Sequence, residues 1–133
     1  MITLKTLADA TEQEVFDQVA NHLLTQMKKS GEYRNYYDSS EYVTYDYVNC
    51  LYRSSDGLKC AAGCLIADDE YKPEFEQKSW RSLREFFPHM ITMKHMDLIY
   101  HLQYIHDDLD VDDWKAALIE FSTANNLEWN FRE

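Results

Sequence analysis

The chain has 133 residues, of which 45% are hydrophobic and 14% aromatic, and this is enough apolar material for one domain with its own core. Thirteen basic side chains stand against 24 acidic ones, and the net charge of -11 argues against binding to nucleic acid or to an anionic membrane. We therefore predict a single folded domain, residues 1–133, whose acidic surface suits a basic surface on another protein.

The location is predicted from the N-terminus and the cysteines. The opening sequence MITLKTLADA lacks a basic segment followed by a long apolar core, and no later apolar run approaches the ~18 residues that span a bilayer. Three cysteines are an odd number, which fits reduced thiols better than a disulfide framework. We therefore expect a cytoplasmic protein that is not secreted and does not enter a membrane.

The first predicted element is a helix that begins after Thr11. Thr11 and Glu14 match a capping box, in which each side chain accepts a hydrogen bond from the backbone amide of the other. Apolar residues then recur at intervals of three and four: Val15, Phe16, Val19, Ala20, Leu23, Leu24 and Met27. This pattern predicts a helix with one buried stripe that ends near the sequence KKSG.

A β-hairpin is predicted next. The tyrosine- and valine-rich segment Tyr42–Arg53 favours a strand, SSDG favours a turn, and Leu58–Cys64 is predicted to be the returning strand. Because a two-stranded hairpin alone is marginal, we expect it to pack against helices. The alternative is that the tyrosines form an exposed interaction surface, with Tyr36 and Tyr45 as candidate partner-binding residues.

Three further helices are predicted in the C-terminal half. Ser79 can cap a helix that stops at Pro88, a longer helix covers about Thr92–Asp107, and Asp110 can cap a fourth helix. The tail sequence LEWNF is a candidate short strand. These elements predict an α+β fold of about four helices packed on a small antiparallel sheet, which is a hairpin with a third strand as an option.

All three cysteines lie in the stretch CLYRSSDGLKCAAGCLI, which raises three alternatives. A structural zinc site needs closely spaced cysteine pairs and a fourth ligand, and Cys50, Cys60 and Cys64 lack both. A cysteine nucleophile needs a base such as His106, and so acidic a chain raises a thiol pKa. We favour packing, because small residues let a helix approach closely. We predict no catalytic residue, metal site or cofactor.

Two candidate binding sites remain. One is an acidic surface for a basic partner, formed by Asp107, Asp108, Asp110, Asp112 and Asp113. The other belongs to the alternative that the chain is a small enzyme or ligand-binding protein with a site in the Cys50–Ile66 region. There Arg53, beside Tyr52, can hold a carboxylate or phosphate bidentately. An ion pair of Arg53 with Asp56 or Asp68 is the competing interpretation.

Three stretches resemble a family of small uncharacterised proteins met mainly in bacteriophage genomes and occasionally in bacteria. They are VANHLLTQMKKS, CLYRSSDGLKCAAGCLIADDEYKPEFE, and LIYHLQYIHDD followed by a tryptophan, and the middle one is the most specific. The family has no assigned activity, so the resemblance implies no catalytic residue. It implies a phage or prophage origin and the host cytoplasm. With the net charge, it predicts an accessory protein that binds a host protein, inhibiting a nucleic-acid-binding or defence protein by charge mimicry.

Overall fold

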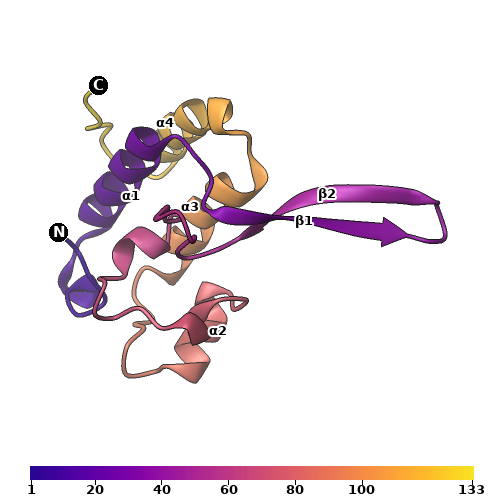
Figure 1. Ribbon diagram of the computed structural model, residues 1–133. Coiled ribbons are helices and arrows are strands. Elements are labelled where there is room, and N and C mark those ends of the chain that lie inside the picture. Colours follow the sequence, from indigo (N-terminus) through magenta and orange to yellow (C-terminus); the bar gives the residue numbers. More distant parts are fainter.

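The computed structural model describes residues 1–133 and confirms the predicted α+β class. The helices and strands follow in the order α1 (Glu12–Gln26), β1 (Gly31–Asp38), β2 (Val43–Cys50), α2 (Trp80–Phe86), α3 (Met96–Asp108) and α4 (Trp114–Ala124) (Figure 1). Four short 3-10 turns accompany them: Leu7–Asp9, Gly63–Leu65, Pro73–Phe75 and Val111–Asp113. None of the helices combines the length and the apolar character that a membrane span requires.

Helix α1 begins with the predicted capping box. The Thr11 hydroxyl oxygen accepts a hydrogen bond from the Glu14 amide (3.1 Å), and the Glu14 carboxylate accepts one from the Thr11 amide (2.9 Å). The predicted stripe is buried except for Met27. Met27 lies one residue beyond the helix in a left-handed conformation (φ 51°), so its side chain leaves the stripe and is exposed.

The sheet is a hairpin, but its strands are paired differently from the prediction. Strand β2 lies within the predicted strand Tyr42–Arg53 and pairs with the preceding strand β1 rather than with a later segment. The register runs from Gly31 opposite Cys50 to Asp38 opposite Val43. Strand β1 is the better partner because it supplies tyrosines of high strand propensity, whereas the later segment is rich in alanine, glycine and cysteine.

The predicted returning strand Leu58–Cys64 is therefore wrong, although the turn before it forms. The Gly57 amide donates to the Ser54 carbonyl (3.1 Å), with Gly57 at φ 84°, and one isolated antiparallel bridge joins Arg53 to Lys59. Beyond the bridge the chain turns into the core, and the third strand offered as an option is absent. The small residues there lie deep in the core instead of on a strand face: Cys60, Ala61, Ala62 and Gly63.

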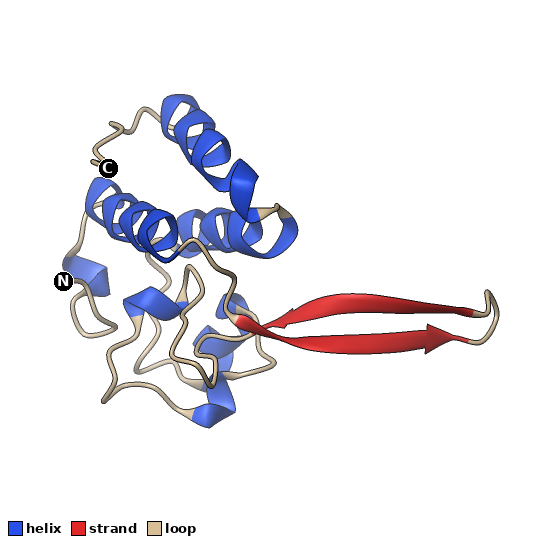
Figure 2. Ribbon diagram, turned by 45° about the horizontal axis from the view of Figure 1, so that its top comes forward, coloured by secondary structure: helices blue, strands red, loops and turns tan.

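The body of the protein surrounds one core cluster of 26 buried residues. Helices α1, α3 and α4 pack against one another, and α2 packs against α3 (Figure 2). Trp114, Phe16 and Phe75 are among the largest fully buried side chains. The hairpin extends away from this body and contributes almost nothing to its core (Figure 2).

Two predicted boundaries in the C-terminal half change. Helix α3 begins at Met96 rather than near Thr92, because His95 adopts a left-handed conformation (φ 69°) and binds the Ala10 carbonyl. The tail packs back without forming a strand, because it meets a helix rather than a sheet edge. There the Gln13 side chain of α1 forms hydrogen bonds with the backbone amide and carbonyl of Glu128 (2.8 and 3.0 Å).

Candidate functional site

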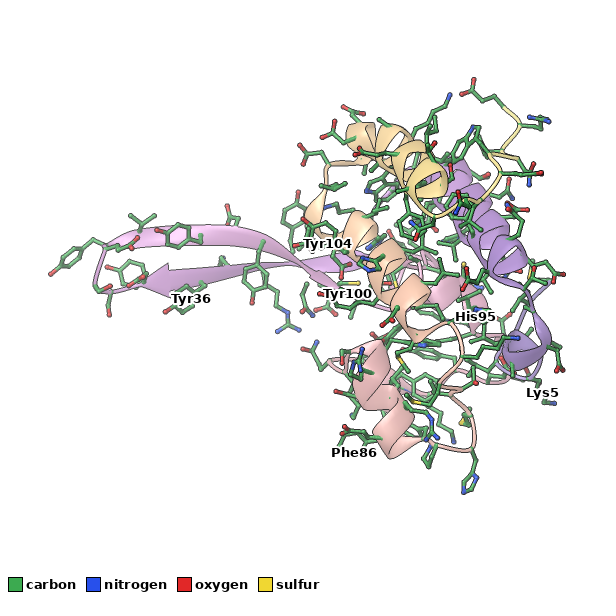
Figure 3. All side chains as sticks on the ribbon, turned by 180° about the vertical axis from the view of Figure 1, so that it is seen from behind. Lys5, Tyr36, Phe86, His95, Tyr100 and Tyr104 are labelled. Carbon is green, nitrogen blue, oxygen red and sulfur yellow. The ribbon has the colours of Figure 1, made fainter.

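The hairpin forms an exposed arm, residues 31–50, which we call the tyrosine arm. Side chains alternate between the two faces of a strand pair, and each cross-strand pair shares a face. One face carries three tyrosines, Tyr36, Tyr45 and Tyr47, and the other carries Tyr33 and Tyr37. No helix covers either face, and every residue from Glu32 to Tyr37 and from Val43 to Val48 is exposed (Figures 1 and 3).

Tyr36 and Tyr45, the two predicted partner-binding tyrosines, lie directly opposite each other on the arm. Their exposed fractions are 59% and 46%, and Tyr33 on the other face reaches 87%. Tyrosine at such positions is unusual, because each ring leaves a large apolar area in water. The structure therefore places both residues on one surface that is free to meet a partner.

The base of the arm is tied to the body through Ser30. The Ser30 amide donates to Nε2 of buried His106 (3.0 Å), and the Ser30 hydroxyl donates to the Leu51 carbonyl (2.7 Å). Each bond satisfies a buried polar group, so breaking the tie carries a desolvation cost. The arm therefore projects from a fixed root on α3.

Cys50, His106 and Asp107 meet at this root. His106 Nδ1 lies 2.7 Å from an Asp107 carboxylate oxygen and 3.9 Å from Cys50 Sγ, and the three side chains could together surround a metal ion. The Ser30 amide, however, makes Nε2 an acceptor, so the neutral ring carries its proton on Nδ1 and donates to Asp107. Metal binding at Nδ1 would require the proton on Nε2, facing the Ser30 N–H, and this disfavours a metal site.

The same tautomer disfavours a cysteine nucleophile. Neither ring nitrogen of His106 has a free lone pair to take the Cys50 proton, because one nitrogen carries a proton and the other accepts from Ser30. The hydrogen bond to Cys60 and burial raise the pKa of the Cys50 thiol, and burial raises the pKa of Cys64 to about 12. A thiolate is the reactive form, and neither site favours it.

We expect native cysteines to resist alkylation. At pH 8 a thiol of pKa about 12 is ionised in about one molecule in ten thousand, and Cys60 is fully buried. Iodoacetamide at pH 8 should therefore label the native protein slowly and the urea-unfolded protein at all three cysteines, as read by mass spectrometry. Rapid labelling of native Cys50 would contradict this arrangement of the root.

Arg53 binds within its own chain. Its guanidinium contacts the Asp68 carboxylate (2.6 Å) and the Ile66 carbonyl (2.7 Å), and it lies 5.1 Å from the centre of the Tyr71 ring. Of the two ion-pair partners considered, the structure selects Asp68. Arg53 lines neither the cavity at the root of the arm nor the one between the N-terminal segment and Arg84, and its contacts connect the segment after the arm to the loop before α2.

Tyr52 lines the first of those cavities, whose volume is about 490 Å³, at the root of the arm. Its hydroxyl donates to the Lys78 carbonyl (2.6 Å), and burial raises its pKa. The aromatic walls also include Trp80 of α2 and two tyrosines of α3, Tyr100 and Tyr104. Sequence reasoning missed the last two, although their spacing of four residues outside the apolar stripe of α3 is a usable signal.

The five predicted acidic residues divide into two groups. Asp107 and Asp108, at the end of α3, line the cavity. The other three lie in the exposed connection to α4: Asp110, Asp112 and Asp113. Asp110 makes no side-chain capping hydrogen bond, so this predicted cap does not form.

The fold and site together describe an α+β protein with a projecting aromatic arm and, at its root, a cavity with aromatic walls. No family model, curated protein or solved structure matches the chain. Its resemblance to phage proteins therefore stays a prediction from the sequence.

Proposed function

We propose that this chain is an acidic accessory protein of phage origin that works by binding a host protein, with the tyrosine arm as the principal contact. The observation that carries the proposal is the exposure of tyrosines on both faces of an arm outside the core. Tyrosine is among the residues that dominate binding energy at protein interfaces. An arm that the core does not need, with large apolar rings in water, is best explained by a partner that covers them.

The charge of the arm favours a basic partner. Its acidic side chains are Glu32, Asp38, Glu41 and Asp46, and Arg34 is its single basic residue, so the arm carries a net charge of -3. The same charge disfavours a second copy of this chain as the partner, because two chains of charge -11 repel each other. A basic surface on a nucleic-acid-binding or defence protein of the host fits this complementarity.

A small enzyme at the Cys50–Ile66 segment has less support. The pKa values of the Cys50 and Cys64 thiols are raised, which favours their unreactive protonated form, and Arg53 is occupied by Asp68. The two strands of the arm also leave their outer edges unpaired, so a partner strand can add to the hairpin as well as contact its side chains.

The proposal predicts that arm tyrosines control binding. The double variant Tyr36→Thr/Tyr45→Thr keeps strand-favouring residues but removes both rings. We expect it to fold normally and to bind the host partner at least about tenfold more weakly, as measured by titration of the partner captured with the original chain. Phe86→Ser is the matched control, because Phe86 lies outside the arm and is more exposed than either tyrosine.

Capture would be run in host lysate at low and at moderate salt, followed by mass spectrometry. Specific capture by the original chain and loss with the double variant support the arm. Capture of no protein at either salt, or equal binding by the original chain and the double variant, would overturn the proposal.

A further inference from the structure

The cavity at the root of the arm has the form of a binding pocket. Its volume of about 490 Å³ lies in the range of small-ligand sites. The end of β2, the start of α2 and one face of α3 surround it. Tyr100 and Tyr104 extend from α3 on the side where the arm leaves the body (Figure 3).

Two carboxylates, Asp107 and Asp108, and two cations, Lys78 and Arg81, line the cavity. Asp108 is exposed and has no hydrogen bond or ion pair within the chain, and one Asp107 oxygen is held by Gln103 (2.8 Å) and His106, which leaves the other oxygen free. The two cations of the cavity are engaged elsewhere. The Lys78 ammonium donates to the Glu74 carbonyl (2.7 Å), and the Arg81 guanidinium lies 3.7 Å from Asp97.

The aromatic walls add a second preference for a cation. Tyr52, Trp80, Tyr100 and Tyr104 all contribute rings, and the faces of such rings attract a guanidinium or ammonium group. A guanidinium fits better than an ammonium, because it stacks flat on a ring and bonds a carboxylate with two parallel N–H groups.

Two donors in the cavity wall lack an acceptor. Nε1 of Trp80, a residue only 5% exposed, and Nδ2 of Asn49 are buried and make no hydrogen bond. Both nitrogens are closed off from solvent, so a ligand in the cavity does not reach them unless the side chains move. The carboxylates and the aromatic rings therefore select the ligand.

We propose that this cavity binds an arginine side chain from an exposed segment of the partner protein. This inference rests on the proposed function, because the arm brings the partner to the root. It also makes that function more specific, because it names the side chain by which the basic partner is bound. The guanidinium stacks on Tyr104, which is 51% exposed, and pairs with Asp108, which lies four residues later on the same face of α3.

The test uses the whole protein and the peptide acetyl-Gly-Arg-Gly-amide. The peptide is titrated into the millimolar range while the indole N–H signals of the three tryptophans are followed by NMR, with Trp80→Phe to assign the Trp80 signal. We expect a saturable shift of the Trp80 signal and little change at Trp114 and Trp129, which lie outside the cavity. The same peptide with citrulline, which is uncharged, should bind at least about fivefold more weakly.

Two variants locate the site. Asp108→Asn and Tyr104→Ala alter exposed residues of the cavity and should each weaken peptide binding several-fold, whereas Asp112→Asn makes the same charge change outside it. No Trp80 shift, an equal response to the citrulline peptide, or equal weakening by Asp112→Asn would overturn the proposal.

The Tyr36→Thr/Tyr45→Thr variant separates the two proposals. It should bind the arginine peptide normally, because both positions lie outside the cavity. If it captures the host partner as well as the original chain does while the peptide still binds, the arm is wrong and the cavity stands. If the peptide fails to bind while partner capture depends on the tyrosines, the cavity is wrong and the arm stands.

Discussion

Gly63→Ala is expected to lower the free energy of unfolding by about 3 kcal/mol, although it adds only one methyl group. A Cβ atom at position 63 would lie 2.2 Å from the Tyr52 carbonyl oxygen and 3.0 Å from its carbonyl carbon. Both are backbone atoms, and Tyr52 is held in turn by Glu76, whose carboxylate accepts from the Tyr52 amide (2.9 Å). The backbone segments at Gly63 and at Tyr52 therefore have to move apart to make room for the methyl group.

Urea unfolding followed by circular dichroism measures this effect. Gly57→Ala is the matched control, since no atom lies within 4 Å of the added Cβ and only the positive φ of 84° opposes it. We expect that variant to lose about 1–2 kcal/mol. Equal losses in the two variants would show that the close approach at Gly63 is unimportant.

Glu70→Ala is expected to lower the free energy of unfolding by about 3 kcal/mol. The carboxylate of this buried residue accepts hydrogen bonds from the backbone amides of Leu4 (2.9 Å), Lys5 (3.1 Å) and Ala67 (2.9 Å). It thereby joins the N-terminal segment to the loop before α2. Alanine would leave three donors without this partner, and at Leu4 the donor is buried.

Glu70→Gln tests the mechanism more finely. The oxygen that binds both Leu4 and Ala67 can be kept as the amide oxygen, while the amide nitrogen would face the Lys5 N–H as a second donor. We therefore expect a loss between those of the original chain and Glu70→Ala, and almost none for the exposed control Glu74→Ala. If Glu70→Ala unfolds at the same urea concentration as the original chain, the carboxylate does not hold the N-terminal segment.

The cysteine-rich stretch Cys50–Ile66 lies where the arm meets the body. Its residues connect the arm to the body. Gly63 lets two backbone segments lie close together, Arg53 holds the following loop, and Cys50 lies against His106. A packing role was predicted for this stretch, but on a strand that does not form. The conclusion that small residues allow a close approach holds in a different local structure.

The arm shows the limits of local patterns most clearly. Tyrosines and valines before Cys50 correctly predict a strand, and the candidate contacts Tyr36 and Tyr45 lie opposite each other in the hairpin. Either β1 or the segment Leu58–Cys64 could pair with that strand. The structure pairs it with β1, through the less typical turn sequence Ser39–Tyr42, because β1 has the higher strand propensity. The exposure of both faces was not predictable, since periodicity alone does not tell whether a helix covers the sheet.

By itself, the sequence determined the acidic charge, the α1 capping box and its buried stripe, the existence of four helices and the tyrosine-rich strand. These features depend on neighbours within a few residues along the chain, where spacing and propensity act directly. Only the tertiary structure decided the partner of β2, the hydrogen bonds of Glu70, the His106 tautomer and the aromatic cavity. Each of these joins residues far apart in sequence, so its energy depends on distances and burial that exist only after the chain has folded.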